Sequence, residues 1–266
     1  MDDALTLLRL QVEWGADESL ELEAVNRLRP AGSATSIPAP TAAKTAPATA
    51  DTLTTGVPTG ELSRLTQAER AAALANQATT LDALRETLAA FDGCPLRDTA
   101  SNLVFAQGDP GSTTLIIGEP PGREEDRGGN PFAGAEGVLL DQILASIGLD
   151  RTRLMLTPLL PWRPPGGRPP NAGEVAMCLP FLHRLIVLLH PRRLVIFGGS
   201  PARALLPAAV TRRRQTPGWL DCRVPGMGGT LPTLSLPSLA EMQKTPSLRR
   251  EAWAGLRLLR RAVEAE

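Results

Sequence analysis

Four acidic side chains and one aromatic ring are gathered in a single stretch, Gly118–Gly134, whose sequence is GEPPGREEDRGGNPFAG. Glycines let a backbone approach a ligand closely and point its N–H groups at it. The carboxylates argue against a simple phosphate cradle, and neither the GxGxxG nor the P-loop pattern is present. Acids, backbone donors and Phe132 together fit a pocket for a planar, hydrogen-bonding ligand such as a nucleobase. Composition alone favours the alternative, an irregular structural loop with Phe132 in a small core.

The chain must supply elements that hold this stretch in place, and its sequence divides into three segments. Residues 1–29 have a helical apolar pattern and form an expected N-terminal appendage, which either docks on a protein partner or is a loosely packed arm. Residues 30–60 are rich in Pro, Ala and Thr and predict a flexible linker. Residues 61–266 hold the expected folded domain.

Within the folded domain, short β-rich runs alternate with helical patterns. The expected helices include residues 61–92 and 246–264, and the β-rich runs lie at residues 113–118, 154–160, 193–199, 220–224 and 231–236. This alternation predicts an α/β fold, a three-layer α/β/α domain with a central, mostly parallel four-stranded sheet. Ligands bind at the carboxyl ends of the strands in such folds. The Gly118–Gly134 stretch directly follows the first strand and so lies at that edge.

Charge and cysteine content limit the partners and the compartment. The 266 residues have zero formal net charge, although residues 79–266 carry twenty-two basic and eighteen acidic groups. A mildly basic domain is compatible with nucleic acid but does not require it. The three cysteines are far apart and include no CxxC pair, which favours a reducing compartment. The N-terminus lacks the positive charges of a signal peptide, and no uninterrupted apolar run is long enough for a membrane span. We expect a cytoplasmic monomer without membrane contact.

The acidic stretch and the residues after it resemble motif 1 of the family 4 uracil-DNA glycosylases, G-E-x-P-G-x-x-E-D-x-x-G-x-P-F-x-G-x-x-G-x-L-L. The chain reads GEPPGREEDRGGNPFAGAEGVLL and keeps every fixed position. The similarity continues through WRPPGGRPP and PSLAEMQKTPSLRREAWAGL and covers about residues 81–262. It implies the uracil-DNA glycosylase fold, DNA as partner, and hydrolysis of the N-glycosidic bond of a flipped uracil or damaged base in base-excision repair.

The resemblance also implies roles for individual residues. Phe132 matches the aromatic side chain that stacks on uracil. Glu119 and Glu125 match catalytic acids, and Glu125 is preferred because a desolvated carboxylate in such a loop could act as a base. The other residues assigned to the site are Gly118, Gly122 and Asp126 around the base and Arg163 and Arg168 along the DNA backbone.

Two positions depart from the family pattern. The second strand of the family normally ends in Thr-Asn, whose amide reads uracil, but this chain has Thr157-Pro158. The last motif normally contains His-Pro, but this chain has Leu236-Pro237. Pro158 has no side-chain donor, and Leu236 cannot stabilise an anionic leaving base. The resemblance therefore implies a glycosylase of weak activity or, alternatively, a degenerate member that binds DNA, a base or a repair partner.

The family usually holds a [4Fe–4S] cluster on four cysteines. Cys94 and Cys178 match two ligand positions, whereas Phe91 and Trp162 stand at the other two. We expect neither a cluster nor another metal, because four thiolates are the usual requirement. The two aromatic side chains are expected to fill the vacated volume as a hydrophobic plug.

Overall fold

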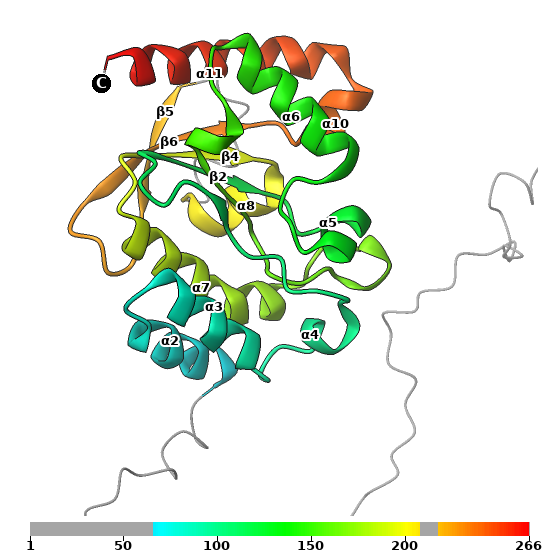
Figure 1. Ribbon diagram of the computed structural model, residues 1–266, viewed down its shortest axis with the longest axis vertical. Coiled ribbons are helices and arrows are strands. Elements are labelled where there is room, and N and C mark those ends of the chain that lie inside the picture. Colours follow the sequence, from blue (N-terminus) through cyan, green and yellow to red (C-terminus); the bar gives the residue numbers. More distant parts are fainter. Residues whose placement is uncertain (1–65, 208–217, 266) are drawn as a thin grey trace, which may run out of the picture. The chain divides into compact units, whose positions relative to one another are not determined.

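The computed structural model describes residues 66–207 and 218–265. The expected helix in residues 1–29, the linker in residues 30–60 and an arginine run at residues 212–214 lie outside the described residues. Within the compact unit that spans Gly56–Glu266, the described part is a β-sheet between two layers of helices (Figure 1). The predicted three-layer α/β/α architecture is confirmed.

The described residues form one six-stranded sheet with the order β1-β3-β2-β4-β6-β5. Its strands are β1 (Gln107–Gly108), β2 (Thr114–Gly118), β3 (Met155–Pro158), β4 (Arg193–Phe197), β5 (Trp219–Arg223) and β6 (Thr230–Leu236). The four central strands are parallel, and both edge strands are antiparallel to their neighbours. The expected count of four strands is therefore corrected to six. Edge strand β5 overlaps the expected β-rich run at residues 220–224, whereas β1 has only two residues, too few to leave an alternating pattern in the sequence.

The helices differ from the expected ones mainly at their boundaries. Those described are α2 (Gln67–Gln77), α3 (Leu81–Ala90), α4 (Leu96–Thr99), α5 (Arg123–Gly128), α6 (Gly134–Ser146), α7 (Ala172–Leu189), α8 (Gly199–Leu205), α10 (Leu239–Lys244) and α11 (Pro246–Glu264), with 3-10 turns η2 (Arg151–Arg153) and η3 (Pro165–Gly167). The described part of the helix expected over residues 61–92 is two helices, because Thr80 caps the second by accepting the Ala83 N–H at 3.1 Å.

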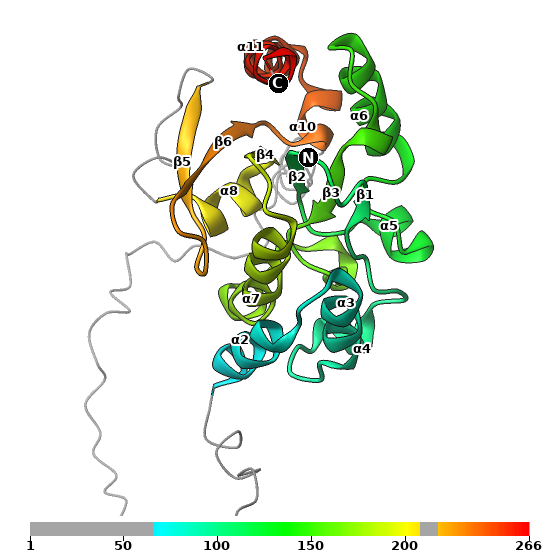
Figure 2. The ribbon, with the colours of Figure 1, turned by 60° about the vertical axis from the view of Figure 1, so that its left-hand side comes forward.

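Helices cover both faces of the sheet (Figure 2), and a separate hydrophobic core packs between each helical layer and the sheet. Successive strand residues point to opposite faces. On β2, Leu115 and Ile117 pack into the core that contains α2, α3 and α7, whereas Ile116 packs into the core of α6, α10 and α11. The same alternation holds on β4. Because helices cover both faces of the sheet, most side chains of the central strands are buried, and the carboxyl ends of these strands are fixed at one edge of the sheet.

Helix α7 is long and apolar, although Glu174, His183 and Arg184 interrupt its apolar run. Its 18 residues have a mean hydropathy of 1.6 and meet the criterion for a membrane-spanning helix by length and composition. In the fold, α7 lies between the sheet and helices α2 and α3, so it buries apolar side chains on two sides. The helix ends at Leu189, and His190 caps it in a left-handed conformation (φ 49°) with its N–H donating to the Ile186 carbonyl at 3.0 Å.

Candidate functional site

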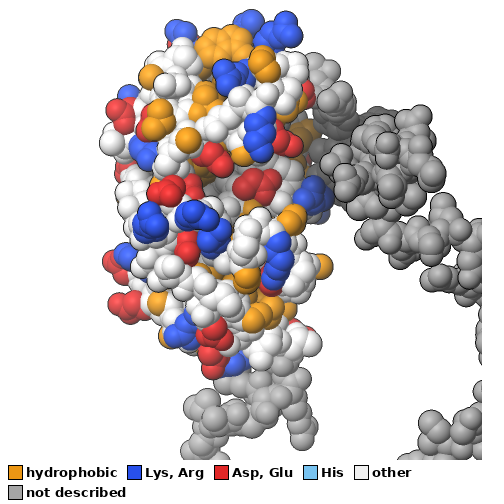
Figure 3. Space-filling view, turned by 90° about the vertical axis from the view of Figure 1, so that its right-hand side faces the viewer, with side chains coloured by type: hydrophobic (Ala, Val, Ile, Leu, Met, Phe, Trp, Pro, Cys, Tyr) orange, Lys and Arg blue, Asp and Glu red, His pale blue; other side chains and the backbone are white. Residues whose placement is uncertain are grey.

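A cavity of about 110 Å³ opens at the carboxyl ends of β2 and β3. Its walls include Glu119, Glu125, Phe132, Glu136 and Pro158, and Ala240 of α10 closes one side. For scale, an apolar cavity of about 150 Å³ takes up benzene. The cavity is therefore close to the size of a six-membered ring. Seen from the side of α5, acidic side chains lie near the middle of this face, with Arg and Lys side chains around them (Figure 3).

The ring of Phe132 lies against the last residue of β2. A Cβ atom added to Gly118 would stand 2.5 Å from the Phe132 Cζ atom, so only glycine leaves room for the ring. Phe132 has a φ of 52°, a left-handed conformation that costs about 1–3 kcal/mol for a residue with a side chain. Arg151 Nη2 donates to the Phe132 carbonyl at 2.9 Å and thus helps to hold this backbone. Phe132 is therefore held in place at its ring by Gly118 and at its backbone by Arg151.

Glu125 holds the motif loop together. Its Oε2 accepts the Gly122 N–H at 3.0 Å, and its Oε1 accepts the Ala133 N–H at 3.0 Å. The first bond secures the start of α5, a helix within the glycine-rich stretch that the sequence did not indicate. The second bond secures the residue that precedes α6. Each oxygen still has a lone pair for a ligand, but both are already used to shape the cavity wall.

Glu119 follows β2 and reaches across to the next strand-to-helix connection. Its Oε1 accepts the Ser200 N–H at 3.0 Å, at the start of α8. A carboxylate is favourable at a helix N-terminus because the first N–H groups there have no partner within the helix. Gly198 precedes α8 with a φ of 110°, and any side chain on it would meet Glu119. One oxygen of Glu119 is therefore committed to the fold.

Asp126 lies next to Glu125 in sequence but does not line the cavity. Its side chain is buried, and Oδ1 accepts the backbone N–H of Ser101 at 2.8 Å and that of Asn102 at 3.4 Å. These bonds tie α5 to the segment before β1. The geometry thus gives Asp126 an anchoring contact. Gly122 and Phe132 line the cavity, whereas Gly118 lies against the Phe132 ring, and their contact with a base stays a prediction.

Glu136 is a cavity residue that sequence reasoning missed. It lies in the first turn of α6, at a variable position of the motif, and its side chain is half-buried. Burial raises the pKa of Glu136, the Glu125 and Glu119 carboxylates raise the pKa further, and Lys244 acts in the opposite direction. The available signal was a charged residue at the start of the otherwise apolar run of α6, beside a loop already rich in acids.

Comparison with known proteins places this site in a family. The family model of the Uracil DNA glycosylase superfamily matches residues 105–257, more than half of the chain. This chain belongs to the uracil-DNA glycosylase superfamily. The match includes strands β1 to β6 and the whole cavity, so the family assignment covers the elements that build the site.

Relatives place the protein beside the family 4 uracil-DNA glycosylases. It is 40% identical over 126 residues to a type-4 uracil-DNA glycosylase of Pyrobaculum aerophilum. The matched residues make up 47% of this chain and 64% of the relative. The chain is 38% identical over 124 residues to that of Archaeoglobus fulgidus (47% and 62%) and 32% identical over 120 residues to that of Thermotoga maritima (45% and 62%). The chain therefore spans somewhat less than two thirds of the length of these relatives.

The two residues that depart from the glycosylase pattern lie at the carboxyl ends of β3 and β6, parallel strands that β2 and β4 separate in the sheet. Pro158 ends β3, pairs in register with Gly118 and lines the cavity. Leu236 ends β6, is 3% exposed and packs in the same core as Phe132. The geometry brings Pro158 directly to the cavity, whereas Leu236 faces a hydrophobic core beside it.

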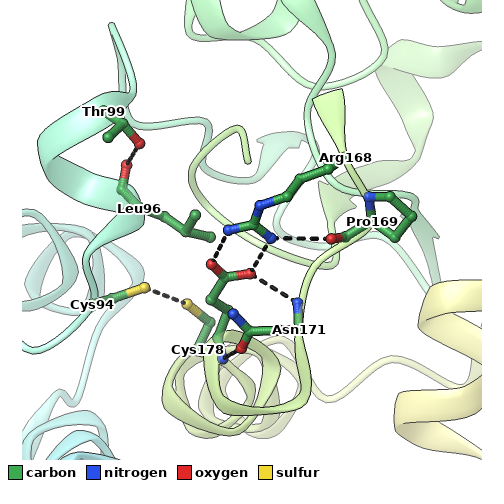
Figure 4. A network of polar contacts seen from close by, with 8 residues as sticks. Cys94, Leu96, Thr99, Arg168, Pro169, Asn171 and Cys178 are labelled. Carbon is green, nitrogen blue, oxygen red and sulfur yellow. Dashed lines mark hydrogen bonds and ion pairs between the residues drawn. The ribbon is translucent and has the colours of Figure 1, made fainter. Parts of the chain in front are cut away.

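The two arginines expected along the DNA backbone lie in the loop before α7. Arg168 binds the buried Glu174 with both terminal nitrogens, at 2.9 and 2.5 Å, and also donates to the Pro169 carbonyl (Figure 4). This hydrogen-bonded pairing lowers the pKa of Glu174. Arg163 is half-buried, and its Nε has no hydrogen-bond partner in the described part of the chain. A DNA contact by either arginine stays a prediction.

Cys94 and Cys178 form a buried thiol pair with their sulfur atoms 3.8 Å apart (Figure 4). The thiol contact lowers the pKa of Cys94 and, together with burial, raises the pKa of Cys178. Phe91 and Trp162, which stand at the other two ligand positions of the glycosylase family, are 2% and 3% exposed and belong to the same core. Two thiols and two packed aromatic rings do not fit a cluster that four thiolates hold.

Proposed function

We propose that this protein is a DNA glycosylase of base-excision repair that recognises a flipped uracil or damaged base in DNA and hydrolyses its N-glycosidic bond with weak activity. The observation that supports this most directly is a ring-sized cavity with Phe132 as one wall, at the carboxyl ends of the strands. Enzymes that act on a base in DNA take it out of the stack and bind it in such a pocket. The names of the relatives support uracil as the base.

Hydrolysis requires a water oxygen to bond to C1′ of the deoxyribose while the bond from C1′ to the base breaks and its electron pair leaves with the base. A carboxylate beside the sugar orients the water, takes its proton and stabilises the cationic sugar. The sequence favours Glu125 for this role, whereas the geometry favours Glu119. Both oxygens of Glu125 accept backbone N–H groups, but Glu119 has one oxygen without a partner among the described residues.

The weakness of the proposed activity follows from the residues around the leaving base. Charge develops on the base as the bond breaks, and a missing donor at that point typically costs about 2.7–4 kcal/mol, or roughly 10²–10³-fold in rate. Pro158 offers no side-chain donor at the cavity, and Leu236 is apolar. The same two residues favour a second candidate function, in which the protein binds a damaged base in DNA without efficient excision.

The two functions are separated by an excision assay on an oligonucleotide with a single deoxyuridine, single-stranded and in duplex, with deoxycytidine at the same place as the control. Alkali cleaves the strand wherever a base has been lost, and the fragments are measured on a denaturing gel. We expect uracil-specific cleavage at a rate at least about 10²-fold below that of the Pyrobaculum relative. Turnover equal to that relative contradicts weak activity. Selective binding without cleavage favours the second function, and neither cleavage nor selective binding contradicts both.

The role of Glu119 is tested in the same assay by Glu119→Gln, which removes the basic carboxylate but keeps its size. We expect a fall in rate of about 10²-fold, as is typical for loss of a general base. Glu124→Gln is the matched control, because Glu124 lies exposed on α5 and does not line the cavity. An excision rate that Glu119→Gln leaves unchanged would mean that another group orients and deprotonates the water.

A further inference from the structure

The Glu136 carboxyl differs from the other two acids of the cavity in having no hydrogen-bond partner among the described residues. Glu125 uses both oxygens on backbone N–H groups, and Glu119 uses one on Ser200. Glu136 stands on α6, in the wall of the same cavity as Phe132 and Pro158. Among the described residues, it is thus the cavity carboxyl with both oxygens left for a molecule in the cavity.

The chemistry of this carboxyl depends on its proton. A neutral carboxyl has one O–H donor and a carbonyl acceptor, the same pair of functions as a side-chain amide, whereas an ionised carboxylate only accepts. Burial and two neighbouring acids favour the neutral form by raising the pKa of Glu136. The groups that face it are Glu119 after β2, Glu125 on α5 and Lys244 on α10, and only Lys244 opposes the neutral form.

We propose that Glu136, as a neutral carboxyl, reads the base in the cavity by donating its O–H to a ring carbonyl and accepting the adjacent ring N–H. This inference rests on the proposed function and names the substrate class of the site: bases that present a C(=O)–N–H edge, as uracil does. The pair of bonds replaces the donor and acceptor that Pro158 lacks. A ring held on Phe132 presents such an edge to the cavity walls.

The neutral form also suits the reaction. Three ionised carboxylates around a cavity of about 110 Å³ would repel a base that gains negative charge as it leaves. A protonated Glu136 removes one of these charges and points a donor at the base. When the pH rises through the raised pKa of Glu136, the donor is lost and the carboxylate faces the ring carbonyl. Recognition of uracil is therefore present at low pH and is lost as the pH rises.

The test compares the affinities of two oligonucleotides across pH 5 to 8.5 by fluorescence anisotropy. One carries a 2′-fluorinated deoxyuridine, in which the electron-withdrawing fluorine slows loss of the base, and the other carries an abasic tetrahydrofuran at the same place. The ratio of dissociation constants, that of the abasic oligonucleotide divided by that of the deoxyuridine oligonucleotide, isolates the contribution of the base from that of the DNA backbone. A high ratio means that the base strengthens binding. The proteins are wild type, Glu136→Gln, Glu136→Ala and the control Glu124→Gln, and melting curves establish that each is folded.

In wild type and in Glu124→Gln, we expect the ratio to fall about ten-fold as the pH rises, the size of a bidentate base contact. Glu136→Gln should keep the full ratio at every pH, because an amide donates and accepts without titrating. Glu136→Ala should have the low ratio throughout. A wild-type ratio that does not change with pH, or an undiminished ratio in Glu136→Ala, overturns the assignment of Glu136 and leaves the proposed function standing. A ratio of one for wild type and Glu136→Gln at every pH overturns the proposed function itself.

Discussion

Replacement of Gly118 by alanine tests whether the Phe132 ring is positioned by close contact with the end of β2. The added Cβ would stand 2.5 Å from Cζ and 2.7 Å from Cε1 of the ring. A normal carbon–carbon separation of about 3.5 Å requires the ring to move by about 1 Å. Gly118 does not have a positive φ, so alanine adds no backbone strain, and the ring contact is the whole perturbation.

The expected cost is that of overpacking, about 1–3 kcal/mol. Loss of glycine flexibility in the unfolded chain offsets up to about 1 kcal/mol of this. For a domain of this size, a change of 1 kcal/mol shifts Tm by about 2–4 °C. We therefore expect Gly118→Ala to lower Tm by up to about 12 °C, with weaker binding of the deoxyuridine oligonucleotide because the stacking surface has moved.

A double-mutant cycle with Phe132→Ala isolates the contact, since the ring is then absent. Gly118→Ala should be neutral or slightly stabilising in the Phe132→Ala background. Gly228→Ala is the control, because its Cβ meets no atom within 4 Å and its φ is not positive. An equal loss of Tm from Gly118→Ala with and without the Phe132 ring would refute the reasoning.

Three further predictions concern the surroundings of the cavity. Glu174→Gln should lower Tm at pH 7, because Arg168 lowers the pKa of Glu174 in the folded state and the ionised carboxylate therefore stabilises the fold. This stabilisation is present above about pH 4.3, the ordinary pKa of Glu, and is lost on acidification, so the Tm difference between wild type and variant should shrink as the pH falls below 4.3. A Tm difference that does not change with pH would contradict the pairing. The double change Pro158→Asn with Leu236→His should raise the rate of uracil excision, whereas no gain in a folded variant means that the cavity has lost more than these two groups. The protein as purified should lack the visible absorption of an iron–sulfur cluster, and a stoichiometric cluster would contradict the inference from the buried thiol pair.

The sequence alone was sufficient for the architecture and for the place of the site. Short apolar runs that alternate with helical patterns predict parallel strands buried on both faces, and β2, β3 and β4 have this character along their whole length. Because Gly118–Gly134 directly follows β2, its position at the carboxyl edge of the sheet followed without any coordinates. The motif also identified Phe132, which lies in the cavity wall.

The direction of each polar side chain, by contrast, was decided by contacts between distant segments. Glu125 and Asp126 are neighbours in sequence, yet Glu125 shapes the cavity while Asp126 binds the segment at Ser101. Arg168 turns to the buried Glu174 of α7, a partner that the arginine-rich loop does not reveal.

Sequence therefore determined the buried strands and the layers they form, because burial leaves an apolar pattern along such elements, whereas the short elements β1 and α5 left no such pattern. The sequence did not determine which acids reach a common cavity. Glu119, Glu125 and Glu136 come from the end of β2, α5 and α6, and they surround one cavity only because the helices pack at fixed places on the sheet. Their mutual repulsion and the raised pKa of Glu136 arise from that packing, so only the tertiary structure set the chemistry of the site.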